Sequence, residues 1–287
     1  MPEAHLQETA PASARELEEP IVRLVRPVKR RLRLADVWRG RQVIRVVAAR
    51  DFKVKYKQSL LGPLWLVFQP IALLAALFIA FRNLADVQPG IPYSVFALVG
   101  LSVWAFFQAS MTIGTASIIT NIMLVRFTPC PRFVFPIAGI IASLPAWAFT
   151  TAAALVAAAV TGALSPRVVL LPLGFAWLFL LTAGFVALTA SFTVRYRDIL
   201  AAMPFLLQVG LFLAPIGYPL QQLGPVARQI VELNPLTGLI EAWRWMIVSD
   251  YSASGRVIGY SVAITVVVLV AGWRTFTKLE TTMADEI

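Results

Sequence analysis

The sequence predicts an all-α polytopic membrane protein with six transmembrane helices. The sequence also predicts an N-terminal amphipathic interfacial helix and short outer-leaflet helices between spans five and six. Six long apolar stretches contain no Asp, Glu, Lys or Arg: residues 62–81, 93–113, 134–160, 168–193, 199–217 and 257–273. About twenty apolar residues in a helix cross a hydrocarbon core of roughly 30 Å. Because backbone polar groups in lipid must be satisfied internally, we expect each stretch to be a helix.

The distribution of positive charge predicts the orientation of these spans. The chain of 287 residues has a formal net charge of +10, and 14 of its 25 Lys and Arg precede residue 62. With the predicted spans in place, 20 of the 25 lie on one side. By the positive-inside rule that side is cytoplasmic, so we expect both termini there. The basic excess then indicates contact with anionic lipid head groups and not with nucleic acid.

The chain lacks the residues that several classes of membrane protein and enzyme need for their chemistry. Ion-driven carriers and intramembrane enzymes usually keep ionisable residues at membrane depth, and the six stretches contain none. No glycine precedes any of the five lysines, so a G-x-x-x-x-G-K-[ST] phosphate loop is absent. A single cysteine, Cys130, and a single histidine, His5, exclude an internal disulfide and a histidine-based metal site. We therefore expect no catalytic residue, metal or cofactor on this chain, and any energy-yielding hydrolysis would belong to a partner subunit.

Three segments follow from the pattern along the chain. Residues 1–33 are rich in Glu, Ala and Pro and then in Arg, which predicts a disordered cytoplasmic tail. Residues 34–58 place apolar and basic side chains on opposite faces of a helix, as expected for an amphipathic helix along the cytoplasmic interface. Residues 59–287 would form the six-span transmembrane domain.

The external segment 218–255 is unusually long and contains two short helical pieces separated by an Asn-Pro break. The second piece, 236–248, contains Glu241 and Arg244. It is too short and too charged to span, which favours a helix dipping partway into the outer leaflet. Trp243 and Trp245 would then lie at head-group level. A seventh span here is the alternative, and it would place the C-terminus outside.

A motif ahead of the first span resembles a known family. Residues 50–65 read RDFKVKYKQSLLGPLW, similar to the signature entering span one of type 2 ABC exporter permeases for polysaccharides such as O-antigen, capsule or teichoic acid. Further similar motifs follow in the expected order: RYRDI at 195–199, PIGY at 215–218, NPL at 234–236 with Arg244, Phe276 with KLE at 278–280, and ADEI at 284–287.

The resemblance implies a homodimer in a bacterial inner membrane, with two copies of a separate ABC ATPase that carry the ATP and Mg²⁺. It implies an amphipathic gate helix before span one, a coupling helix between spans two and three, and short outer helices before span six. The expected function is the permease subunit of an ATP-driven exporter that moves a polyprenyl-pyrophosphate-linked polysaccharide across the cytoplasmic membrane. One alternative is an ABC permease for a small lipid or drug. A lipid-modifying enzyme would need clustered His or acidic residues at one membrane face.

Two groups of residues are candidates for contact with such a substrate. Aromatic planes stack on sugar rings, although packed or lipid-facing aromatics would give the same pattern. The preferred channel-lining positions are Phe106, Phe107, Gln108 and Trp147. Converging cations near the bilayer surface suit a diphosphate, although simple topology anchoring also explains them. The candidate lipid head-group gate comprises Arg50, Lys53, Lys55 and Lys57.

A third group is a candidate for coupling to the ATPase. The segment from about residue 115 to 125 would be cytoplasmic and contain a short helix around residues 117–125. The boundary between spans four and five carries two arginines and an aspartate, where positive-inside anchoring explains the arginines but not the acid. The coupling candidates are Ser117, Asn121, Arg195, Arg197 and Asp198.

Overall fold

The computed structural model describes residues 34–57, 59–127 and 130–280, and these residues are helical with short connections. Its α-helices are α1 (Leu34–Arg39), α2 (Arg41–Tyr56), α3 (Trp65–Leu77), α4 (Tyr93–Thr120), α5 (Ile122–Phe127), α6 (Val134–Ile141), α7 (Leu144–Val160), α8 (Leu171–Thr193), α9 (Asp198–Leu213), α10 (Pro225–Leu233), α11 (Pro235–Ile247) and α12 (Gly255–Leu279). Short 3-10 or π-helical pieces are η2 (Gly62–Leu64), η3 (Phe78–Leu84), η4 (Pro166–Leu170) and η5 (Leu220–Gln222). The predicted all-α fold is confirmed. The predicted tail 1–33, position 58 and the ADEI motif at 284–287 lie outside the described residues.

Five helical stretches are long and apolar enough to cross a membrane: Gly62–Asn83, Tyr93–Thr120, Val134–Val160, Pro166–Thr193 and Gly255–Leu279. They correspond to five of the six predicted spans. The predicted fifth span, 199–217, is shorter than expected because α9 ends at Leu213 and Ala214 is extended. At 1.5 Å per residue, the 16 residues of α9 measure about 24 Å. Residues 214–219, which follow α9, are not helical.

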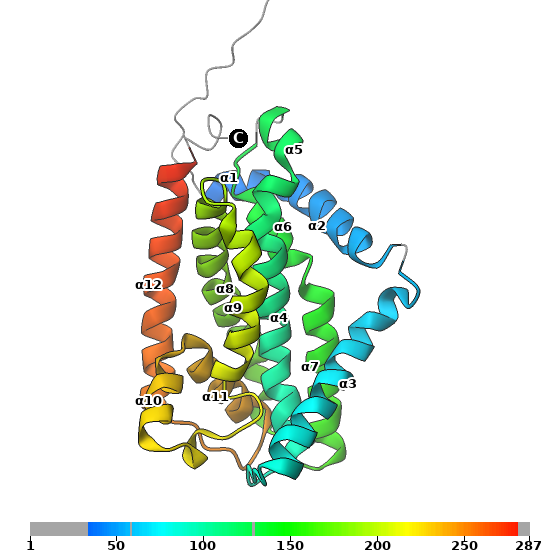
Figure 1. The fold of residues 1–287 in the computed structure, drawn as a ribbon, viewed down its shortest axis with the longest axis vertical. Coiled ribbons are helices and arrows are strands. Elements are labelled where there is room, and N and C mark those ends of the chain that lie inside the picture. The colour runs from blue at the N-terminus through cyan, green and yellow to red at the C-terminus, as the bar shows by residue number, and fades with distance from the viewer. Residues whose placement is uncertain (1–33, 58, 128–129, 281–287) are drawn as a thin grey trace, which may run out of the picture. The chain divides into compact units, whose positions relative to one another are not determined.

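The long helix α4 lies at the centre of the bundle, and most of its residues are buried. Helices α3, α6, α7, α8, α9 and α11 all contact it (Figure 1). Glycine allows the closest of these approaches, since a Cβ added to Gly139 of α6 would lie 2.8 Å from Cα of Gly114 on α4. A Cβ on Gly184 of α8 would likewise lie 2.9 Å from Cα of Leu269 on α12. Small residues at such crossings let helices pack closely within lipid.

The predicted amphipathic helix forms as α1 and α2, divided at Gly40. Ile44, Val47 and Ala48 of α2 are buried in a hydrophobic cluster with residues of α6, including Phe135. Figure 1 shows α2 at the end of the bundle that carries α5, and α3 running back from it toward the opposite end of α4. Within α3 only Leu77 is buried. Helices α2 and α3 therefore diverge from the bundle at their junction.

The loops predicted to be cytoplasmic share one end of the bundle. Helices α2 and α5 and the C-terminal end of α12 lie at this end, and α10 and α11 lie at the other (Figure 1). The backbone N–H of Arg132, in the loop after α5, donates to Oε1 of Glu280 at 3.0 Å. Which end faces the cytoplasm stays a prediction.

The helix α11 differs from its predicted placement. Trp243 is fully buried and packs edge-on against Trp147, with ring centroids 6.2 Å apart. Trp243 is therefore covered by other helices and does not face lipid, while its depth in the membrane stays a prediction. Most residues of α11 are buried against α12, α4 and η4, because its two charged side chains are satisfied inside the protein and need no water.

Candidate functional site

A cavity of about 1040 Å³ lies between α2, α3, α4 and α7. Its lining from α2 is largely charged, with Arg50, Asp51 and Lys55. Its lining from α3 and α4 is mostly apolar and includes the indole rings of Trp65 and Trp104. Two side-chain amides, those of Gln69 and Gln108, also line it. The cavity can thus offer cations to an anionic group, and aromatic rings and amides to a neutral polar one.

The guanidinium of Arg50 makes two kinds of contact at the α2 side of this cavity. Its Nη2 and Nε donate to Oδ1 of Asp51 at 2.6 and 3.1 Å. The same Nη2 donates to Oδ1 of Asn121 at 2.6 Å. The Arg50 side chain is 44% exposed, so these contacts leave part of the guanidinium open to solvent.

The other candidate gate residues divide into one that lines the cavity and two that do not. Lys55 lines it, together with Arg50, whereas Lys53 and Lys57 are exposed and lie outside the lining. Surrounding apolar groups partly desolvate the ammonium of Lys55 and lower its pKa, although the residue as a whole is exposed. The structure thus brings two of the four predicted cations to one site.

Of the predicted channel-lining residues, only Gln108 lies on the cavity. Phe106 is 0% exposed, with its ring centroid 5.4 Å from that of Phe175. Phe107 is buried against Phe185, and the Trp147 ring lies 4.2 Å from Phe175. Phe106 and Phe107 are buried and Trp147 is half-buried, and none of the three lines the cavity, so their assignment as lining residues of this cavity is corrected.

Three aromatic residues line the cavity without having been preferred from the sequence: Trp65, Trp104, which is only 2% exposed, and Phe68. The signal for the second was present, because Trp104, Gln108 and Thr112 are spaced four residues apart on α4 and share one face. Neighbouring Phe106 and Phe107 point to other faces, which the surrounding helices cover. Helical spacing from a polar residue identifies this lining better than aromatic character alone.

The predicted coupling residues divide into a buried group and an exposed group. Ser117 is buried and donates to the carbonyl of Gly114, and Asn121 is buried between α4 and α5. Neither presents a surface to a partner, so their assignment as direct contacts is corrected. The exposed part of this region is α5, whose Met123 and Phe127 are 65% and 80% exposed.

The turn between α8 and α9 exposes Arg195, Arg197 and Asp198. Arg195 lies over the ring of Tyr196, 5.6 Å from its centroid. Within the described residues, Asp198 forms no ion pair with either arginine, so the ends of α8 and α9 are not joined by an arginine–aspartate pair. All three side chains remain available to a partner.

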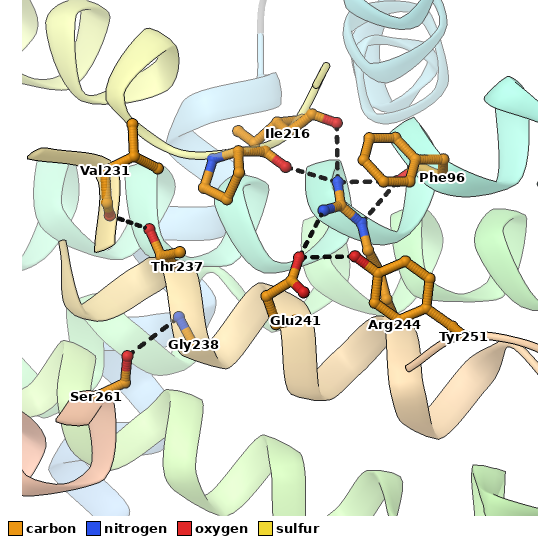
Figure 2. A network of polar contacts seen from close by, with 10 residues as sticks. Phe96, Ile216, Val231, Thr237, Gly238, Glu241, Arg244, Tyr251 and Ser261 are labelled. Carbon is orange, nitrogen blue, oxygen red and sulfur yellow. Dashed lines mark hydrogen bonds and ion pairs between the residues drawn. The ribbon is translucent and has the colours of Figure 1, made fainter. Parts of the chain in front are cut away.

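A second charged cluster is buried at the opposite end of the bundle (Figure 2). Nη1 of Arg244 lies 3.2 Å from Oε1 of Glu241, and both side chains are almost completely buried, at 0% and 1% exposure. Nη2 of Arg244 donates to the carbonyls of Pro215 and Ile216 at 2.6 and 3.0 Å. The hydroxyl of Tyr251 donates to Oε1 of Glu241 at 2.7 Å.

This cluster stabilises the backbone that follows α9, which ends where Pro215 favours an extended conformation at Ala214. Carbonyls beyond the helix end have lost their helical partners, and burying them unpaired would be costly. Arg244 donates to the carbonyls of Pro215 and Ile216, and Nδ2 of Asn234 donates to the carbonyl of Leu213 at 3.2 Å. The PIGY, NPL and Arg244 motifs, which are separate in sequence, therefore meet at the end of α9. This site is structural, since its donors and acceptors satisfy one another.

Together, the apolar helices, the interfacial helix and the cavity beside it define a multi-pass membrane protein of the transporter class. Residues 42–248 match the family model described as ABC-2 type transporter. The chain belongs to this family. Its members are membrane subunits of transporters, and membership implies partnership in the membrane with an ABC ATPase.

Curated relatives cover most of the chain. The O-antigen export system permease protein RfbA of Klebsiella pneumoniae is 26% identical over 244 residues, which is 84% of this chain and 93% of the relative. A second Klebsiella pneumoniae protein of that name is 24% identical over 249 residues. The protein of that name from Myxococcus xanthus is 24% identical over 262 residues, 88% of this chain and 98% of the relative. The predicted kinship with polysaccharide-export permeases is confirmed.

Proposed function

We propose that this chain is the membrane-spanning permease subunit of an ATP-driven exporter that moves a polyprenyl-pyrophosphate-linked polysaccharide across the cytoplasmic membrane. The observation that carries the proposal is the cavity beside α2, which combines cations with aromatic and amide groups. The relatives named as O-antigen export permeases support the same substrate class.

The lining matches the parts of such a substrate. A diphosphate at the membrane surface needs cationic donors, which Arg50 and Lys55 supply in a partly desolvated setting where charge-assisted hydrogen bonds are strong. A sugar next to the diphosphate presents C–H faces and hydroxyls. The ring of Trp65 and the amide of Gln108 are suited to both. A purely apolar drug would need no such amide and cation set.

We propose that the working assembly is a homodimer with two copies of a separate ATPase, which hold the ATP and Mg²⁺. It would lie in a bacterial inner membrane with both termini cytoplasmic, in line with the excess of basic residues before the first span. The exposed apolar residues of α3, Phe68 and Ile71 among them, suit contact with lipid or with a second protomer. Exposed Met123 and Phe127 on α5 offer a hydrophobic contact for the ATPase.

Deletion of the gene for this chain tests the substrate class. The proposal predicts loss of a surface polysaccharide and accumulation of its lipid-linked form inside the cell, both restored by the wild-type chain. Unchanged surface polysaccharide, with altered efflux of a small lipid or drug, would contradict it. The purified chain alone should hydrolyse no ATP, because the sequence contains no phosphate-binding loop.

The ATPase contact can be tested by labelling. Phe127→Cys is exposed, and Cys130→Ser removes the one native thiol. A thiol reagent should modify the variant permease alone and fail to modify it in complex with the ATPase. Equal labelling with and without the ATPase would place the contact elsewhere.

A further inference from the structure

Asn121 lies at the hinge between the central helix α4 and the exposed helix α5. Its side-chain Nδ2 donates to the carbonyl of Ser117 in the last turn of α4 at 2.7 Å. Its backbone carbonyl accepts from the N–H of Val125 in α5 at 3.0 Å. One residue thus ends α4 and begins α5, so whatever holds the Asn121 side chain also fixes the angle between the two helices.

The remaining side-chain group of Asn121 is held by the interfacial helix. Its Oδ1 accepts from Nη2 of Arg50 at 2.6 Å. The orientation of the amide is fixed by its partners, because a guanidinium can only donate and the Ser117 carbonyl can only accept. Arg50 also lines the cavity. The same guanidinium therefore faces the proposed substrate site and holds the hinge.

A second observation ties the two helices together. Val125 of α5 is buried in the same hydrophobic cluster as Ile44, Val47 and Ala48 of α2. Close-packed clusters transmit displacement because they do not deform continuously. Helices α2 and α5 are therefore connected both by the Arg50–Asn121 hydrogen bond and by shared packing.

We propose that Arg50 is a switch between the cavity and the hinge: a diphosphate bound in the cavity draws its guanidinium away from Asn121, and this frees α5 to move against the ATPase. The proposal rests on the proposed function. A diphosphate carries more negative charge than the carboxylate of Asp51 and, unlike the neutral amide of Asn121, forms charge-assisted hydrogen bonds. Losing Arg50 leaves the Asn121 contact to Ser117 intact, so the hinge loosens without unfolding.

The competition gives two variants opposite effects on diphosphate binding. Asn121→Ala removes a competitor for Arg50, so we expect the purified chain in complex with its ATPase to bind geranyl diphosphate about threefold to tenfold more tightly. Asn121→Asp places a carboxylate against Arg50 and should weaken binding by a similar factor. Thr277→Ala, whose hydroxyl bonds within its own helix at the same end of the molecule, is the control and should leave binding unchanged.

Amide hydrogen exchange over residues 122–127 measures whether α5 is released when a diphosphate binds. Adding geranyl diphosphate should increase exchange in the wild type. Asn121→Ala should show raised exchange before any ligand is added and little further change. Inorganic pyrophosphate serves as a second ligand, since tighter binding of geranyl diphosphate identifies a lipid head group and equal binding identifies a free diphosphate.

The outcomes separate the two proposals. If wild-type protein binds neither diphosphate, the head-group site and the switch are both overturned. If it binds geranyl diphosphate but Asn121→Ala and Asn121→Asp match the wild type in affinity and in exchange, the head-group site stands and the switch is overturned. A shift of the two variants in opposite directions supports the switch.

Discussion

Two arginine–carboxylate pairs of this protein, Arg50–Asp51 and Arg244–Glu241, differ more in their surroundings than in their geometry. Arg50 and Asp51 lie 2.6 Å apart with side chains 44% and 16% exposed. Arg244 and Glu241 lie 3.2 Å apart with side chains 0% and 1% exposed. The shorter distance belongs to the more exposed pair, where water and ions compete for the same charges. Distance alone therefore says little about which pair holds the fold.

The difference indicates what each pair can do. Every contact of Arg244 is inside the protein, to backbone carbonyls and to Glu241, so removing it would strand buried polar groups. Arg50 faces a cavity and can exchange partners at small cost. The buried pair stabilises the backbone that follows α9, and the exposed pair is free to respond to a substrate.

Arg244→Ala should give the largest effect, because it leaves a buried carboxylate and the carbonyls of Pro215 and Ile216 without their donor. We expect a loss of about 3–5 kcal/mol in the free energy of unfolding, enough to prevent recovery of a monodisperse protein. Arg50→Ala is the matched comparison and should cost at most about 1 kcal/mol. Thermal unfolding and size-exclusion profiles in detergent measure both, and equal losses would undo the distinction.

Tyr251→Phe should give an intermediate effect. The substitution removes one hydrogen bond to Glu241 and leaves the ring in place. The expected loss is about 1–3 kcal/mol, that of a buried carboxylate deprived of one donor. Tyr260→Phe on the exposed side of α12 is the control, and a melting temperature equal to that of Tyr251→Phe would show that the buried hydroxyl contributes nothing.

Arg256→Ala should give the smallest effect. Nη2 of Arg256 pairs with Oε2 of Glu232 at 2.8 Å and joins α10 to the start of α12, but the arginine side chain is 76% exposed. Water replaces such a partner readily, and Arg228 still pairs with the other oxygen of Glu232. We expect a change in stability of about 0.5 kcal/mol or less, falling further at high salt. A loss as large as that of Tyr251→Phe would mean that exposure does not rank these contacts.

The sequence was sufficient for features that depend on a single segment. Long charge-free stretches predicted five of the spans, and the opposed faces of residues 34–58 predicted α2. The end of α9 has a local signal, because Pro215 favours an extended conformation at Ala214, but the sequence could not show that Arg244 donates to carbonyls nearly thirty residues earlier in the chain.

The candidate site was predicted only in part for the same physical reason. The cations of α2 were found from their charge, but charge could not tell Lys55, which lines the cavity, from Lys57, which does not. Aromatic character could not tell Trp65, which lines the cavity, from Phe106, which is buried, since neighbouring helices decide which face is covered. Asn121 looked like a partner contact, and only the fold shows it bonded to Arg50.

The most direct test of the proposed export site compares single lysines of α2. Lys55→Gln removes a cavity cation, and Lys57→Gln removes an equal charge outside the cavity lining. Polysaccharide at the cell surface should be measured per inserted permease. The proposal predicts severalfold lower export for Lys55→Gln and near-normal export for Lys57→Gln, with normal insertion of both because the other basic residues before the first span still set the orientation. Normal export by Lys55→Gln, or equal losses in the two variants, would contradict a head-group site in this cavity.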